Sequence, residues 1–324
     1  MTLHIFQKQV STAATELVAQ SVQEFNAASG GALIMGDGDH IGDYVEQTSW
    51  QLLGSLAQRR NAYGEGNLTP QELGQILDRM VKVDGRVGPV TVTPTMMKRL
   101  GKDVSEAAAV VATQAAEAMI QDYLNTVGSA LKAAFSGNSE VVTDLSSADG
   151  VSPSLRGLNR GTRPFGDAHS RIIAWLMDGA TYNDFIDESL SNANRLFQIG
   201  NVSIMQDGMG RRFVISDIPA LSEGNLQHVL GLTAGAAAVT TTPLIMKAQD
   251  LLGQENIKAL LQGEYDFTLG LRGYQWKSND IKSPTNEQIA SSDNWAKIVT
   301  SVKDTAGVLA TFGKSAAVRK AKTE

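Results

Sequence analysis

The chain of 324 residues contains no cysteine. Disulfide bonds, thiolate metal sites and cysteine nucleophiles are therefore excluded. It also lacks an unbroken apolar run of about 18 residues. The nearest approach, residues 230–246, is interrupted by threonines, glycines and Pro243, and residues 1–10 lack the apolar centre of a signal peptide. We expect no membrane-spanning helix.

Residue patterns for catalysis are equally scarce. The four histidines stand in no zinc-binding spacing, and neither a GxSxG elbow nor a GxxxxGK[ST] phosphate loop occurs. The net charge is −6 and the 28 basic residues are scattered along the chain, which argues against sequence-specific nucleic-acid binding. The sequence therefore predicts no catalytic, cofactor-binding or metal-binding residues.

One cluster of acidic residues leaves an enzymatic function open as an alternative. Asp37, Asp39, His40 and Asp43 lie close together and would suit a metal-dependent hydrolase. A calcium loop starting at Asp37 would place Ile41 and Thr48 at ligand positions, where they cannot serve. A polar turn is the favoured interpretation.

Two helices are clearly indicated. Apolar residues recur every three to four positions over residues 8–28, which predicts an amphipathic helix ending at Ser29-Gly30-Gly31. A second helix is predicted over residues 103–136, with Asp103 as N-cap and many alanines. At ~1.5 Å per residue it would be about 50 Å long. A helix of this length must span the full width of a domain or run along the whole length of a flat molecule.

Between these helices, residues 31–95 read as a long extended excursion. Thr69-Pro70 is typical of a helix start, and Asp84-Gly85 is a turn signal between two stretches of alternating valines. Several glycines would allow this segment to hinge.

After a loop-rich stretch at 138–168, helices are predicted over 168–178 and from Thr181 to about Phe197. A hairpin should join residues 201–206 to 211–217. Strict alternation predicts a strand over 264–276, with a bulge near Gly270 or Gly273 where its phase flips. The predicted helices and strands do not alternate in the βαβ order of a parallel α/β protein. The sequence therefore indicates an α+β fold.

The order and spacing of these parts resemble the major capsid proteins of tailed bacteriophages with the Hong Kong 97-type capsid fold. The resemblance covers nearly the whole chain. The sequence segments that carry it are residues 79–90, 103–136, 169–177, 215–219 and 264–276. The resemblance implies an N-terminal arm at 1–30, an extended loop or E-loop at 31–95, a peripheral domain at 96–149 with the spine helix 103–136, an axial domain at 150–255, and a return to the peripheral domain at 256–324 with a C-terminal helix around Asn294-Trp295.

For function, the resemblance implies a non-enzymatic coat protein that self-assembles as pentamers and hexamers into an icosahedral shell around phage DNA. It implies a separate scaffolding protein, a portal, optionally a decoration protein, no sequence-specific DNA contact, and assembly in the bacterial cytoplasm before residence in the virion. An encapsulin-like nanocompartment shell protein is the alternative within the same fold. The residues predicted at subunit contacts are Asp39, Trp50, Arg59, Arg60, Arg86, Arg160, Arg163 and Trp175.

Overall fold

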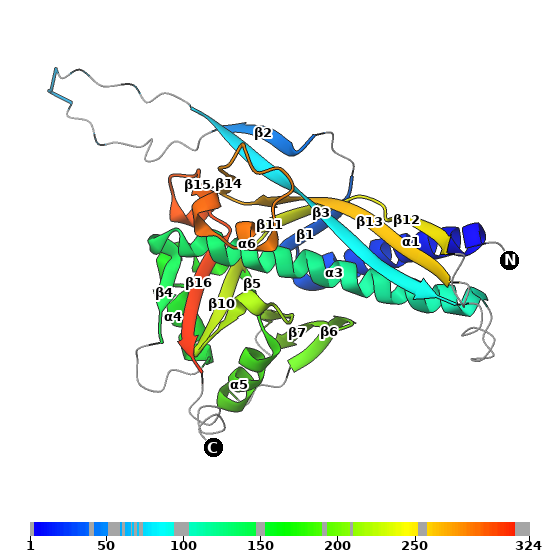
Figure 1. Cartoon of the computed structure of the whole chain (residues 1–324). Coiled ribbons are helices and arrows are strands. Elements are labelled where there is room, and N and C mark those ends of the chain that lie inside the picture. Colours follow the sequence, from blue (N-terminus) through cyan, green and yellow to red (C-terminus); the bar gives the residue numbers. More distant parts are fainter. Residues whose placement is uncertain are drawn as a thin grey trace.

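The computed structural model describes residues 3–38, 42–50, 59, 62–65, 67, 70, 74–93, 104–146, 153–189, 193–207, 210–251 and 258–314. It is an α+β molecule in which a long helix lies across two eight-stranded mixed sheets (Figure 1). Most of its core is one continuous apolar cluster that takes side chains from both long helices and both sheets, and a smaller cluster fills the far face of the second sheet. No helix in the described ranges is long and apolar enough to cross a membrane.

The first helix, α1 (Leu3–Ser29), confirms the predicted amphipathic helix. Its buried residues recur every three or four positions and pack beside α3, where the two helices run together (Figure 1). They are Val10, Ala14, Val18, Val22 and Phe25. The helix ends where Gly30 and Gly31 take φ values of 70° and 73°, which glycine adopts readily.

The long helix is α3 (Val104–Ser136), 33 residues that confirm the predicted rod. Small alanines along its first half allow close approach to α1, and larger side chains such as Tyr123 and Phe135 fill the core along its second half. The Tyr123 ring meets the Phe267 ring edge-on at 4.8 Å between centroids.

Sheet A lies on one side of α3. Its strands are β1 (Leu33–Asp37), β2 (Tyr44–Trp50), β3 (Gln75–Val92), β11 (Ala237–Thr241), β12 (Ile245–Leu251), β13 (Lys258–Leu271), β14 (Tyr274–Trp276) and β15 (Trp295–Lys297). The central strand β13 pairs with β3 along one edge and with β11 and β12 along the other, and β1 joins β11 in parallel.

Two predictions in this sheet are corrected. Asp84-Gly85 makes no turn, because β3 continues through it, and Gly85 lies opposite Tyr265 where it leaves room for that ring. The phase flip near Gly273 is a tight turn between β13 and β14 rather than a bulge, with Gly273 at φ 77° and Leu271 paired to Tyr274. The predicted helix start at Thr69 lies outside the described residues.

Sheet B lies on the other side of α3, with spatial order β4-β16-β10-β5-β8-β7-β6 and β9 beside β10. Its strands are β4 (Val142–Asp144), β5 (Ile172–Met177), β6 (Ala193–Ile199), β7 (Val202–Asp207), β8 (Arg212–Ile215), β9 (Ser222–Glu223), β10 (Leu226–Thr233) and β16 (Gly307–Gly313). The β7–β8 pairing confirms the predicted hairpin.

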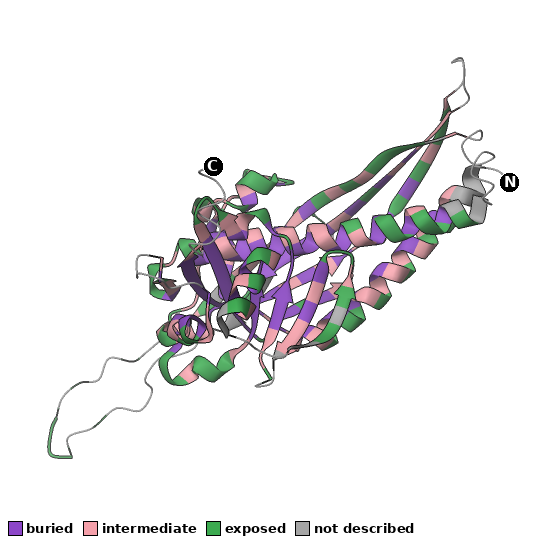
Figure 2. Cartoon of the chain, turned by 90° about the horizontal axis from the view of Figure 1, so that it is seen from below, coloured by how far each residue is buried: buried purple, intermediate pink, exposed green. Residues whose placement is uncertain are grey.

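The helix predicted over 168–178 is wrong. The chain there forms the end of a 3-10 helix, η2 (Arg163–Arg171), followed by strand β5. Because β5 lies at the centre of sheet B, its side chains enter the large core cluster on one face and the smaller cluster on the other. β5 is therefore a continuous apolar run that lacks the alternation of a half-buried strand, and Figure 2 shows how burial varies over the molecule. The helix predicted from Thr181 is confirmed as α5 (Gly179–Ser189). Its predicted continuation to Phe197 is wrong, because strand β6 begins at Ala193.

The remaining helices among the described residues are short. They are α4 (Leu155–Gly161), α6 (Asn286–Ile289) and the 3-10 segments η1 (Ser139–Val141), η3 (Pro219–Leu221), η4 (Ser292–Asn294) and η5 (Val302–Asp304). The helix expected around Asn294-Trp295 is corrected, since Trp295 begins strand β15 and stacks edge-on against Trp276 across the β14–β15 pair.

Candidate assembly surfaces

The β2–β3 hairpin leaves the body of the molecule at one end, toward the upper left of Figure 1. β3 is paired with β13 from Val81 to Val92, whereas over residues 75–80 the described strands provide it with a partner, β2, on one side only. The Lys82 N–H donates to the Asp43 carbonyl, so the antiparallel alternation turns the backbone N–H and C=O groups of Leu77 and Arg79 away from β2. Residues 75–80 therefore present an open strand edge.

A set of polar contacts holds the root of this hairpin. Arg79 pairs with Glu46 on β2 at 2.6 Å, hydrogen-bonds Asn279 and lies 5.7 Å from the centroid of the Tyr44 ring. The Tyr44 hydroxyl donates to the Ile281 carbonyl at 2.6 Å. Burial, with Asp43 nearby, raises the pKa of Tyr44, which keeps this donor protonated. These contacts fix the direction in which the hairpin departs.

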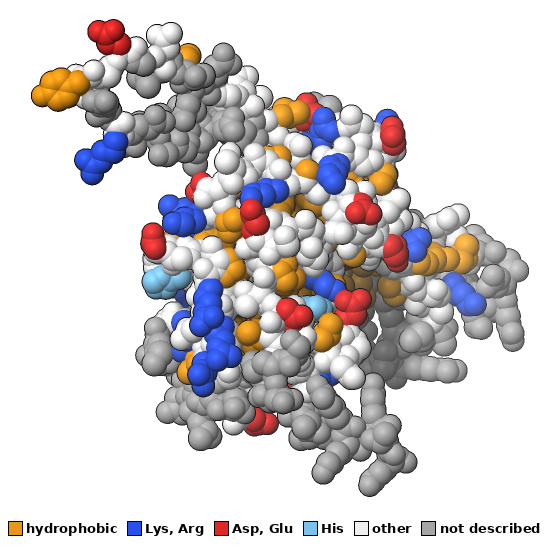
Figure 3. Space-filling view, turned by 90° about the vertical axis from the view of Figure 1, so that its left-hand side faces the viewer, with side chains coloured by type: hydrophobic (Ala, Val, Ile, Leu, Met, Phe, Trp, Pro, Cys, Tyr) orange, Lys and Arg blue, Asp and Glu red, His pale blue; other side chains and the backbone are white. Residues whose placement is uncertain are grey.

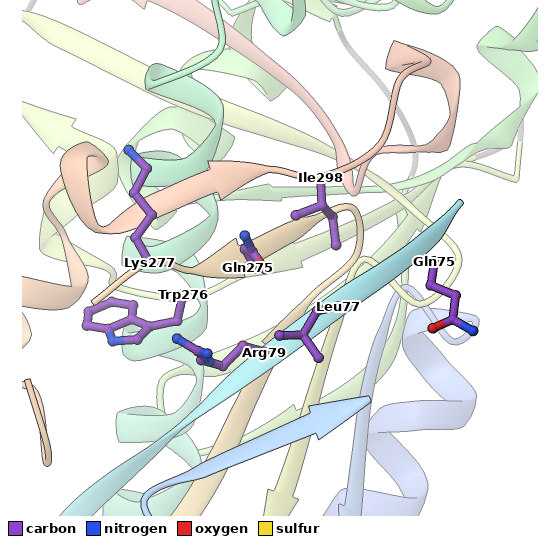
Figure 4. A pocket seen from close by; sticks show the side chains of 7 residues that line it. All are labelled: Gln75, Leu77, Arg79, Gln275, Trp276, Lys277 and Ile298. Carbon is purple, nitrogen blue, oxygen red and sulfur yellow. The ribbon is translucent and has the colours of Figure 1, made fainter. Parts of the chain in front are cut away.

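Beside the open edge lies a notch of about 440 Å³, between β3 and the β14–β15 pair (Figure 4). Its lining combines half-exposed Leu77, exposed Lys277 and buried Trp276 with amide and aliphatic side chains. The full lining is Gln75, Leu77, Arg79, Gln275, Trp276, Lys277 and Ile298. The Trp276 indole N–H is buried and has no hydrogen-bond partner in the described part of the chain. Such a lining suits an extended polypeptide rich in acceptor groups; it holds no nucleophile paired with a base.

A buried carboxyl sits on the same strand. Asp78 pairs in register with Gln47 of β2, and its Oδ1 is buried without a hydrogen-bond partner among the described residues. Burial raises the pKa of Asp78 from 3.8 to about 6. The hairpin root therefore contains a group that titrates in mildly acidic solution.

On sheet B, a second polar cluster joins α3 to the strands. Lys132 of α3 pairs with Glu223 at 2.6 Å, and His228 of β10 has its Nε2 3.8 Å from the same carboxylate. The His228 Nδ1 lies 3.1 Å from the Thr311 hydroxyl. Burial, reinforced by Lys132, lowers the pKa of His228, so it is neutral at pH 7.

Three arginines gather on α4 and the start of η2, and they are named here the cationic flank: Arg156, Arg160 and Arg163. Arg156 and Arg163 are exposed and Arg160 is half-buried. None of the three forms an ion pair within the described ranges. Figure 3 looks onto the end of the molecule where α4 lies and shows basic side chains gathered on the lower part of that face.

The residues predicted at subunit contacts are distributed over several surfaces. Arg59 is exposed, and exposed Arg86 lines a second hollow of about 560 Å³ beside Ile245. Arg160 and Arg163 belong to the cationic flank. Trp175 is corrected to a core residue, because it is only 4% exposed and packs against Gly161 and Gly231. Asp39, Arg60 and the side chain of Trp50 lie outside the described residues.

The acidic group considered as a metal site is only partly described. The Thr241 hydroxyl donates to Asp37 at 3.2 Å, and Asp43 pairs with Lys282 at 3.4 Å. Asp39 and His40 lie outside the described residues, and the rest of the described chain contains no cluster of metal-binding side chains.

The sequence did not predict the notch or the Lys132–Glu223–His228 cluster, because each of them joins segments more than 90 residues apart.

A long helix across two sheets, with a hairpin projecting beside an open strand edge, defines the class of shell-forming proteins that share the Hong Kong 97-type capsid fold. The chain belongs to the family described as Gp13-like, major capsid protein 13-like, whose model matches residues 2–309. It is therefore a major capsid protein, the subunit of a viral shell. No curated protein sequence matches the chain.

Solved structures agree on the fold. A chain of Mycobacterium phage Adephagia superposes with a TM-score of 0.54 at 12% identity, covering 89% of this chain and 90% of that one. A chain of the cyanophage Pam1 capsid asymmetric unit gives 0.51 at 11% identity, covering 86% of each chain. A chain of the capsid of Ralstonia phage GP4 gives 0.50 at 10% identity, covering 88% of this chain and 87% of that one.

Proposed function

We propose that this major capsid protein assembles as pentamers and hexamers into a closed icosahedral shell that encloses phage DNA. The observation that carries the proposal is the β2–β3 hairpin, which leaves its own body and exposes a strand edge and a notch that the described chain does not cover. Contacts between unlike patches close into rings when their rotation allows it. Many modest contacts per subunit then add up to a stable shell.

At the hairpin root, an extended segment of a neighbouring subunit is the proposed occupant of the notch. It would add to the open edge at Leu77 and Arg79, where backbone donors and acceptors face outward. Its acceptor groups would meet the exposed ammonium group of Lys277. Arg59, Arg60, Arg86, Trp50 and Asp39 remain proposed contacts in the extended loop.

The finer organisation is also a proposal. The arm at 1–30, the extended loop at 31–95, the axial domain at 150–255 and the two peripheral segments would act as separate contact surfaces. A separate scaffolding protein, a portal and optionally a decoration protein would complete the particle, which would assemble in the host cytoplasm. The acidic net charge of −6 agrees with an enclosing wall that does not bind DNA by sequence, and the subunit would catalyse no reaction.

Electron microscopy of the expressed chain, with and without its co-expressed scaffold, tests the shell. Wild-type protein should form closed particles of uniform diameter. Leu77→Asp should leave folded subunits that fail to close, because a charge at the notch would have to be desolvated. Leu77→Met keeps the apolar surface and should assemble like wild type. A wild-type chain that remains monomeric at high concentration would refute the proposed assembly.

A further inference from the structure

Charge is segregated along the part of the chain that forms the cationic flank and α5. No acidic residue occurs between Asp149 and Asp167, a stretch that contains the three arginines of the cationic flank. No lysine or arginine occurs between Arg171 and Arg195, a stretch that contains α5 and four acidic residues. The two neighbouring stretches therefore carry charge of opposite sign.

The fold places the two blocks over opposite parts of sheet B. α4 packs on β16, because Gly157 and Gly161 bring it against Phe312 and Ala310; a Cβ at Gly157 would lie 2.4 Å from the Phe312 ring. α5 packs on β8, where the rings of Tyr182 and Phe185 lie 5.9 and 5.0 Å from the Phe213 ring. Both helices cover the same face of the sheet, over the smaller core cluster.

The two blocks are too far apart to neutralise each other within one subunit. Strands β10 and β5 lie between β16 and β8, so three steps of about 4.8 Å separate the helices by roughly 14 Å. That separation exceeds the ~8 Å screening length at physiological salt. Arg156, Arg160 and Arg163 form no ion pair with the described residues, and neither does exposed Asp187 of α5.

We infer that the cationic flank of one subunit binds the acidic α5 of a second copy of this chain. β4, beside α4, is one edge of sheet B, and β6, two strands beyond β8, is the other. A ring of identical subunits repeats one contact between unlike flanks, so opposite charges on opposite flanks select the correct order and orientation. The inference rests on the proposed assembly into rings and names the pair of surfaces that meet within them.

Charge reversal with rescue tests the pairing. Arg156→Glu with Arg163→Glu, and separately Asp187→Arg, should each lower the yield of particles about ten-fold while the subunit unfolds at the wild-type temperature. The three changes combined should restore at least half of the wild-type yield. Arg156→Lys with Arg163→Lys, which keeps the charge, is the matched control. Reversed variants that assemble like wild type would overturn the inference. So would a combined variant no better than its parents.

A cross-linking experiment decides the question even if shells do not close. The chain has no cysteine, so Arg163→Cys and Asp187→Cys each introduce a single thiol. When the two variants are mixed and treated with a bismaleimide, a covalent dimer should form at least ten-fold more than with either alone. Arg163→Cys mixed with Thr113→Cys, an exposed position on α3, is the control. Equal yields in both mixtures would overturn the pairing.

A competing interpretation is that the cationic flank binds the phosphates of packaged DNA. That interpretation predicts that the reversed arginine variant assembles normally but that its particles retain less nucleic acid, and this result would overturn the pairing. Absence of wild-type particles, together with a positive cross-link, would contradict closed-shell assembly and support the pairing.

Discussion

At the scale of single residues, Gly85 shows how a position can be fixed by a neighbour across the sheet. A Cβ there would lie 2.2 Å from the Tyr265 ring, which is buried and donates its hydroxyl to Asp122 at 2.7 Å. We expect Gly85→Ala to lower the free energy of unfolding by about 1–3 kcal/mol, because the ring cannot move without losing that bond. Gly36→Ala, with open space at the Cβ, should stay within about 0.5 kcal/mol of wild type. Urea denaturation of both variants measures the difference.

The Asp78 carboxyl gives a prediction on pH. Its pKa in the folded protein, about 6, is above its ordinary value of 3.8, so the folded state binds the proton more tightly. Its contribution to stability is complete below pH ~4 and is lost as pH rises through 6. Asp78→Asn should remove this slope and raise the unfolding free energy at pH 7 by about 1 kcal/mol, allowing for partial solvent screening.

Thermal unfolding between pH 4 and 7 measures the Asp78 effect. Asp84→Asn, at an exposed site on the same strand, is the control and should keep the wild-type profile. An Asp78→Asn profile parallel to wild type would contradict a buried, unpartnered carboxyl at the hairpin root.

At the scale of elements, α3 is anchored to sheet A by an aromatic side chain with an unpaired polar group. Tyr123 packs on Tyr265 and Phe267, and its buried hydroxyl has no hydrogen-bond partner among the described residues. Tyr123→Phe should therefore raise the unfolding free energy by about 1 kcal/mol, whereas Tyr123→Ala should lower it by about 3–5 kcal/mol. Chemical denaturation checks both; a Phe variant weaker than wild type would show that the hydroxyl does have a partner.

The elements that sequence predicted well are those with one buried face. α1 and the β7–β8 hairpin carry a clear helical or alternating period, and the alanines of α3 favour a helix by themselves. β5 was missed because both of its faces are buried, and the length of β3 was missed because Gly85 looks like a turn until Tyr265 is placed beside it.

At the scale of the whole molecule, the surfaces combine distant parts of the chain. The notch forms only where residues 75–79 lie beside residues 275–298. The topology of sheet A brings these segments together, and the local periodicity of the sequence does not reveal that topology. The cationic flank lies within one short stretch of sequence, yet scattered basic residues elsewhere concealed it. It becomes visible because α4 and η2 present its arginines together, and these arginines form no ion pair with the described residues.

The long pairing of β3 with β13, which is interrupted by one register shift between Leu261 and Gly263, determines how the hairpin responds to load. A shell under internal pressure would pull each hairpin outward along its own strand axis. Hydrogen bonds perpendicular to that axis are then strained in parallel, as in shear, so many must break at once. Because β13 is central in sheet A and that sheet packs on α3, tension would spread from the hairpin into the rigid rod. Under such tension, the contacts between neighbouring subunits should break before the strands of sheet A separate.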